Sequence, residues 1–124
     1  MTSLSLNVEI LHAELRLSLG EGPAWDCVGG FLYFVDIERD SVFKLQVSTG
    51  DVDTCTIRRP SAIGLCRSGS LIIACQAGVV LLDFENRKAT PICDPIEHKP
   101  LARLNDGKVA PDGSFWVGSM QNNI

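Results

Sequence analysis

Three segments of the sequence repeat one pattern, and this repeat limits the available folds more than any other feature of the chain. Each segment has a short, partly apolar stretch, then a turn that contains glycine, then a strongly apolar stretch. The strongly apolar stretches begin at Phe31, Leu71 and Phe115, so the repeat is 40 and then 44 residues long. A period of about 40–45 residues with several strands per unit is typical of the blades of a β-propeller. The repeat therefore predicts an all-β fold made of blades.

The sequence between the repeated hairpins supplies the outer strands of each blade. "SVFKLQV" follows the first hairpin and "GVVLLDF" follows the second, and each leads through a turn to another short stretch. We therefore expect blade 1 at about 20–57, blade 2 at about 61–93 and the start of blade 3 at about 101–124. The innermost strands would line a central channel. The second strands would be buried between blades, which explains apolar runs such as "FLYFV" and "LIIAC".

The number of blades is too small for a closed propeller. Propellers close with about 4–8 blades, whereas this sequence holds two blades and the beginning of a third. We interpret the 124 residues as the N-terminal part of a single propeller domain. The alternative is a small stand-alone β-sandwich. Helical periodicity is almost absent from the chain, and residues 8–19, "VEILHAELRLSL", are the one stretch that could form a helix; we expect them to form a strand.

Charge and cysteine content exclude several classes of protein. The formal net charge is −4, and the densest basic spot, Arg58-Arg59, is too small to neutralise nucleic-acid phosphates. The N-terminus has no signal-peptide pattern, and no apolar run is long enough to cross a membrane. The five cysteines have no CxxC spacing. We therefore expect a cytoplasmic protein with reduced thiols, most of them packed in the core, and with no nucleic-acid or membrane partner.

Three motifs resemble the regucalcin and gluconolactonase family, which is also called the senescence marker protein family. They are "LGEGPAWD" at 19–26, "LYFVDIERDSVFKL" at 32–45 and "RLNDGKVAPDGSFWVGSM" at 103–120. The resemblance runs in order from about residue 15 to residue 120. It implies a six-bladed propeller, a divalent metal ion (Ca²⁺, Zn²⁺, Mn²⁺ or Mg²⁺) at the top of the central channel, and hydrolysis of a small-molecule sugar lactone.

The resemblance also implies which residues form the site. The family's metal-binding glutamate maps onto Glu21, and its substrate-binding arginine and asparagine map onto Arg103 and Asn105. The two remaining metal ligands, including the aspartate that acts as general base, would lie beyond residue 124, so no catalytic residue is expected within this chain. A further substrate-contacting acid of the family maps onto Asn123, and this departure changes the expected recognition of substrate hydroxyl groups.

The residues themselves agree with these roles, although each has a simpler interpretation. A carboxylate is a hard oxygen ligand for divalent cations, but Glu21 alone could equally be a turn residue. Arg103 can donate a planar fork of hydrogen bonds, and Asn105 can both donate and accept. In "RLNDGK" the Asn-Asp-Gly triplet is a turn formula, so Asp106 is expected to cap a turn and Lys108 to be structural or exposed.

Other residues are expected to have structural roles. Trp25 and Trp116 lie in strand patterns and are predicted to pack in the core. The alternating acids Asp36, Glu38 and Asp40 are expected to lie at the rim of a hairpin.

Three functions compete on this evidence. The first is a metal-dependent sugar lactonase, of which the 124-residue chain would be a truncated and largely inactive part. The second is a non-catalytic, calcium- or metal-binding regulatory propeller. The third is a degenerate propeller that docks other proteins. Self-association through open blade edges is a further expectation, because unpaired strand edges bind other strands.

Overall fold

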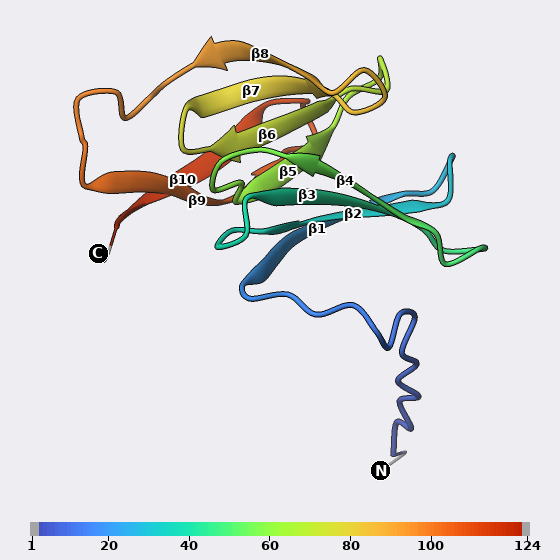
Figure 1. The fold of residues 1–124 in the computed structure, drawn as a ribbon. Coiled ribbons are helices and arrows are strands. Elements are labelled where there is room, and N and C mark those ends of the chain that lie inside the picture. Colours follow the sequence, from blue (N-terminus) through green and yellow to red (C-terminus); the bar gives the residue numbers. More distant parts are fainter. Residues whose placement is uncertain (1–2, 123–124) are drawn as a thin grey trace.

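A computed structural model of the chain describes residues 3–122, and within this range it contains ten β-strands in three antiparallel sheets (Figure 1). The first sheet has, in order, β1 (Gly20–Asp26), β2 (Phe31–Asp36), β3 (Ser41–Gln46) and β4 (Val52–Thr56). The second has β5 (Ala62–Leu65), β6 (Leu71–Cys75), β7 (Gly78–Asp83) and β8 (Lys88–Cys93). The third pairs β9 (Ala102–Val109) with β10 (Phe115–Gln121).

The prediction of an all-β fold is confirmed. The first two sheets are meanders in which consecutive strands pair, the third is a single hairpin, and each is built on a glycine-containing hairpin of the repeat. Within residues 3–122 the chain has no helix of the length and apolarity needed to cross a membrane.

The second sheet forms the centre of the molecule because it is covered on both faces. One face packs against the first sheet in a core that includes Val35, Val42, Ile73 and Leu82. The other face packs against β9 and β10 in a smaller core around Leu104. A strand that is buried on both faces needs apolar side chains at successive positions. This arrangement explains why the stretch "LIIAC", which forms β6, does not alternate between apolar and polar residues.

The five cysteines are free, and only two of them are core residues. None of the five forms a disulfide in the described part of the chain. Cys55 and Cys75 are buried in the core between the first two sheets, whereas Cys27 and Cys93 are exposed. Burial raises the pKa of the Cys75 thiol above its ordinary value.

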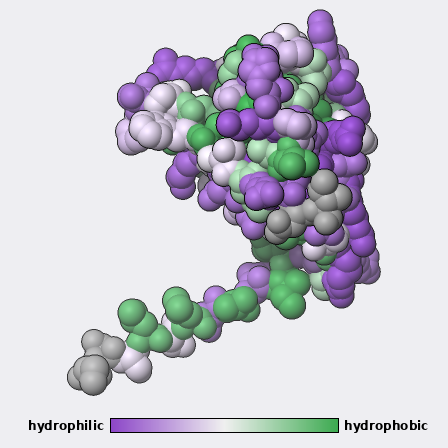
Figure 2. All heavy atoms as spheres, turned by 90° about the vertical axis from the view of Figure 1, so that its left-hand side faces the viewer, coloured by the Kyte–Doolittle hydropathy of each residue, from purple (hydrophilic) through white to green (hydrophobic). Residues whose placement is uncertain are grey.

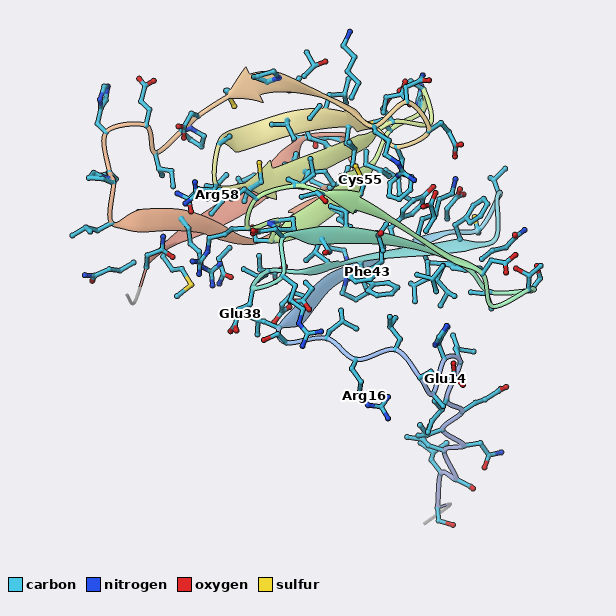
Figure 3. The ribbon with its side chains drawn as sticks, viewed as in Figure 1. Glu14, Arg16, Glu38, Phe43, Cys55 and Arg58 are labelled. Atoms are coloured by element: carbon cyan, nitrogen blue, oxygen red, sulfur yellow. The ribbon has the colours of Figure 1, made fainter. Side chains whose placement is uncertain are left out.

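The strand expected at residues 8–19 does not form. This segment is irregular, and the first strand begins only at Gly20. Its first part extends away from the three sheets, as the position of Glu14 in Figure 3 shows, whereas Ser18 and Leu19 bond to Asp36 at the end of β2. A strand needs a partner for its backbone N–H and C=O groups, and the part of this segment that extends away from the sheets in Figure 1 has none beside it.

The prediction that both tryptophans pack in the core is wrong. Trp25 in β1 is 52% exposed and Trp116 in β10 is 71% exposed. Only the second sheet is covered on both faces, and each tryptophan lies on one of the outer two sheets. Ala24 in β1 and Val117 in β10 pack against the two cores, whereas the two tryptophan side chains lie outside them.

Replacing Gly78 by alanine is expected to lower the free energy of unfolding by about 2 kcal/mol or more. Gly78 has φ +107°, and a Cβ there would overlap the Cys93 carbonyl oxygen and lie 2.7 Å from the Asp94 Cα atom. Gly113→Ala is the matched control. Gly113 has φ +89° and no neighbouring atom within 4 Å of the place where a Cβ would lie, so only the backbone conformation contributes, at about 1 kcal/mol. Urea denaturation of both variants measures the difference. Equal losses would contradict the packing argument.

Candidate functional site

The first strands of the three sheets meet along one line in the molecule. β1, β5 and β9 contact one another and all begin at the same end, on the left in Figure 1. Gly22 allows β1 to approach the start of β5 closely, because a Cβ there would lie 3.3 Å from the Ser61 carbonyl oxygen. A Cβ at Gly107 would lie 3.2 Å from the Cβ of Ala62. The residues that begin these three strands therefore gather at one mouth. Figure 2 shows this face, on which hydrophilic and hydrophobic residues are mixed.

A buried carboxylate holds the chain just before Glu21. Asp36, at the end of β2, is 0% exposed and accepts hydrogen bonds from the backbone N–H groups of Ser18 (2.8 Å), Leu19 (3.1 Å) and Arg39 (3.2 Å). Burial raises the pKa of Asp36, but the hydrogen bonds from these backbone donors more than offset it, so the pKa lies below its ordinary value. Asp36 is therefore an anchor for the start of β1. It lies at the end of the β2–β3 hairpin, as the sequence indicated, but its side chain is buried.

Two of the three inner strands are irregular where the predicted site residues lie. The pairing of β1 with β2 shifts register between Glu21 and Ala24, and Gly22 in this interval has φ +61°. The pairing of β9 with β10 shifts between Leu104 and Gly107, which is the interval that contains Asn105. β-Bulges redirect side chains and are common beside functional sites. Both shifts therefore fall at positions that the sequence singled out.

A pocket of about 540 Å³ runs along the three inner strands. Its lining includes Glu21 and Trp25 from β1, Gly64 from β5, and Asp106 and Lys108 from β9. Glu21 is exposed, so its carboxylate is accessible at the mouth. The lining is about as polar as it is apolar, so this pocket offers several polar groups to a small molecule.

Arg103 and Asn105 form a pair at the start of β9. Arg103 is only 8% exposed, and its Nη1 atom donates to the Leu104 carbonyl oxygen (3.1 Å) and to Asn105 Oδ1 (3.2 Å). Burial lowers the pKa of the Arg103 guanidinium, the positive charge of Arg59 lowers it further, and the Glu21 carboxylate opposes both. The guanidinium therefore lies within electrostatic reach of Glu21, although neither Arg103 nor Asn105 lines the pocket that contains Glu21.

The Asn-Asp-Gly triplet is not a turn. It lies inside β9, and the Asp106 carboxylate accepts a hydrogen bond from the Gly107 N–H group (2.8 Å). The register shift in β9 is a local irregularity of the strand, and such an irregularity accommodates residues that otherwise favour turns. As a result Asp106 lines the pocket instead of capping a turn, and Lys108, which also lines it, is exposed as expected. Asn123, the other predicted substrate-contacting residue, lies outside the described residues.

Arg59 is a residue of the mouth that sequence reasoning missed. It lies in the connection from β4 to β5, is half-buried and has φ +46°. Its backbone N–H donates to Asp40 Oδ1 (2.8 Å), which ties this connection to the loop between β2 and β3. The adjacent Arg58 lies at the same end of the molecule (Figure 3). The sequence showed the Arg58-Arg59 pair only as a basic spot, and no pattern distinguishes the two residues.

The described residues do not by themselves fit a complete metal site. No group of three or more His, Cys, Asp or Glu side chains within residues 3–122 is placed to hold a cation. A calcium ion needs about 6–8 oxygen ligands, and Glu21 supplies at most two of them. Glu21 therefore fits as a single ligand, and a metal ion here would need donors from outside these residues.

Comparison with known sequences gives one family and many relatives. The model of the family described as the SMP-30/Gluconolactonase/LRE-like region matches residues 19–124. Regucalcin of Xenopus laevis is 33% identical over 121 residues, which are 97% of this chain and 40% of that protein. The 6-deoxy-6-sulfogluconolactonase of Pseudomonas putida is 31% identical over 103 residues, which are 82% of this chain and 35% of that protein. The chain therefore spans about 40% or less of the length of these relatives.

Comparison with solved structures agrees with the family match from the sequence. The calcium-binding protein regucalcin of Agrobacterium tumefaciens superposes with a TM-score of 0.82 at 27% identity, and the match covers 87% of this chain and 37% of that one. This likeness confirms the predicted fold class, in which the three sheets are part of a β-propeller.

Proposed function

Because this chain belongs to the SMP-30/gluconolactonase/LRE-like family, whose model matches residues 19–124, we propose that it supplies part of the active site of a metal-dependent sugar lactonase. The observation that supports this proposal best is the buried Arg103, which is paired with Asn105 at the mouth where Glu21 is exposed. A guanidinium and an amide beside a carboxylate can hold a polyhydroxylated substrate, because together they provide both donors and acceptors.

The metal ion of this proposal would have Glu21 as one ligand. Its other ligands would come from blades that complete the ring around the channel, because one carboxylate cannot hold a dication alone. When bound, a divalent ion polarises a carbonyl group and lowers the pKa of water.

The residues of this chain would hold the lactone for attack by water. Hydrolysis adds water to the carbonyl carbon and breaks the ring C–O bond, so one end becomes a carboxylate and the other a hydroxyl group. Arg103 donates to a lactone or sugar oxygen through the N–H groups that Leu104 and Asn105 leave free. Nη1 already bonds both of these residues, which fixes the plane of the guanidinium. A donor that is fixed before the substrate binds stabilises the developing charge without having to reorganise.

Lactone hydrolysis is the experiment that tests this function. We expect the natural protein containing this chain to hydrolyse glucono-1,5-lactone above the spontaneous rate, and to lose this activity when EDTA removes divalent ions. We expect the 124 residues alone to show only the spontaneous rate, because they supply a single expected metal ligand. A pH-stat or proton-release assay with and without added Ca²⁺, Zn²⁺ or Mn²⁺ measures both results.

The hydrolysis assay, together with metal titration by calorimetry, distinguishes a lactonase from a metal-binding protein without catalytic activity. The similarity to a protein described as calcium-binding favours a regulatory, non-catalytic propeller as the second candidate. Metal uptake by calorimetry without lactone hydrolysis would replace the first function by the second. Hydrolysis that EDTA does not affect would contradict the metal-dependent mechanism.

A further inference from the structure

The pocket along the three inner strands extends well beyond the mouth. Glu21 lies at the mouth, and Trp25, which lines the same pocket, lies four residues further along β1. Because β1 has one residue more than β2 in the bulge between Glu21 and Ala24, these four residues span about 10–13 Å at about 3.3 Å per strand residue. The pocket volume of about 540 Å³ is in the range of sites that enclose drug-sized ligands. A single sugar ring at Glu21 would therefore fill only the outer part of the pocket.

The inner part of the pocket has an exposed aromatic wall. Trp25 is 52% exposed, and the exposed residues Pro23 and Leu65 line the same pocket. Trp116 differs, because it does not line this pocket and its indole N–H donates to the Ser114 hydroxyl (3.0 Å). The face of an aromatic ring carries partial negative charge, so it packs well against the C–H groups of a sugar ring.

Two charged side chains of opposite sign belong to the same lining. Asp106 and Lys108 are exposed at alternate positions in the second half of β9, so they lie on one side of the strand. In residues 3–122, neither forms an ion pair within 4 Å. A charged ligand would be attracted by one of them and repelled by the other. A neutral ligand rich in hydroxyl groups can use both, because the carboxylate accepts hydrogen bonds and the ammonium group donates them.

We propose that the inner part of this pocket, with Trp25, Asp106 and Lys108, is a subsite for a second sugar ring, so that the substrate is the lactone of a disaccharide acid. This inference rests on the proposed function for the lactone end, which lies at Glu21, and it adds the sugar ring linked to that end. Water still opens the lactone ring, and the glycosidic bond to the second sugar stays intact. An aromatic face together with a donor and an acceptor suits a sugar ring, which presents both C–H and O–H groups.

Binding of two stable sugars tests the subsite without any need for turnover. Methyl β-cellobioside has one glucose ring more than methyl β-glucoside, and neither is a lactone. We expect the natural protein containing this chain to bind the cellobioside about tenfold more tightly than the glucoside, a ratio that corresponds to about 1.4 kcal/mol. Calorimetry measures the two affinities. The indole N–H signal of Trp25 in ¹H–¹⁵N spectra should shift when the cellobioside binds.

Variants of the two exposed tryptophans separate this subsite from general contact between sugars and indole rings. Trp25→Ala should remove the tenfold preference, whereas Trp116→Ala, which removes the same side chain outside the pocket, should keep it. Trp25→Phe should retain part of the preference, because an aromatic face remains, and it provides the result if Trp25→Ala disturbs folding. Equal binding of the two sugars, undetectable binding of both, or an equal effect of Trp25→Ala and Trp116→Ala would each overturn the proposal.

The failure of this proposal and the failure of the lactonase function can be told apart. If the protein hydrolyses glucono-1,5-lactone but shows no preference for the cellobioside, the subsite is wrong and the lactonase function stands. If it prefers the cellobioside in a Trp25-dependent way but hydrolyses no lactone, the subsite stands and the lactonase function is wrong. If both are right, kcat/KM for cellobiono-1,5-lactone should exceed that for glucono-1,5-lactone by about tenfold, because the second ring adds binding energy to the transition state.

Discussion

Replacing Glu21 by glutamine is expected to lower kcat/KM for glucono-1,5-lactone at least about 100-fold in the natural protein containing this chain, and to weaken divalent metal binding. Glutamine has nearly the same shape but no charge, and loss of a charged ligand removes part of the several kcal/mol that a bound cation supplies to the reaction. The fold should not change, because the Glu21 side chain is exposed at the mouth and packs in neither core. Steady-state kinetics and metal titration by calorimetry measure the two effects.

Glu38→Gln is the matched control for this prediction. Glu38 is also an acid at the mouth, as Figure 3 shows, but its carboxylate bonds the Ser18 hydroxyl and is not assigned to the metal ion. We expect this variant to keep metal affinity and activity within about twofold, since surface substitutions of this kind usually have effects within about 0.5 kcal/mol. If Glu21→Gln retained full activity, Glu21 would not be a ligand.

Replacing Asp36 by alanine is expected to lower the free energy of unfolding by about 3 kcal/mol or more. Three backbone N–H groups, those of Ser18, Leu19 and Arg39, would lose their acceptor, and each buried group left unpaired costs about 1–3 kcal/mol. Asp26→Ala is the control, because Asp26 also accepts from two backbone N–H groups but does so in an exposed turn, where water can replace it. That variant should lose about 1 kcal/mol. Equal losses in urea denaturation would contradict the anchoring role.

The contribution of Asp36 to the free energy of unfolding should also decrease as the pH falls. Its pKa is below the ordinary value in the folded chain, so the unfolded chain takes up the proton first as the pH falls. The stabilisation is therefore complete above the unfolded pKa of about 4 and is lost as the pH falls below it. The difference in unfolding free energy between wild type and Asp36→Ala should thus shrink between about pH 6 and pH 3. A difference that stays constant over this range would show that the charge of Asp36 is not involved.

The repeat in the sequence predicted the sheets because strands and their turns are local features. Glycine-containing turns and apolar runs of strand length each depend on a few neighbouring residues. The hairpin strands consequently begin at Phe31, Leu71 and Phe115, as the pattern indicated. The positions of Arg103 and Asn105 at the start of an inner strand follow from the same local logic.

The structural features that could not be predicted from the sequence depend on contacts between segments that are distant along the chain. The sequence around Asp36 does not indicate that this residue accepts a hydrogen bond from the backbone N–H of Ser18, which lies 18 residues earlier in the chain. The strand pattern around Trp116 suggested a core residue. The pattern does not indicate how many layers cover the sheet, and the side chain is exposed. Arg59 differs from Arg58 only through its left-handed backbone and its tie to Asp40, neither of which has a sequence pattern. Long-range packing overrode local propensity in each case.

The position of a bound metal ion tests the central proposal most directly. Crystals of the natural protein containing this chain, soaked with Mn²⁺, would reveal the ion through its anomalous scattering. We expect one peak about 2.0–2.6 Å from a Glu21 carboxylate oxygen, at the mouth that Arg103 and Asn105 share. A peak that avoids Glu21, or its absence at saturating Mn²⁺, would contradict the assignment of this mouth as a metal-dependent lactonase site.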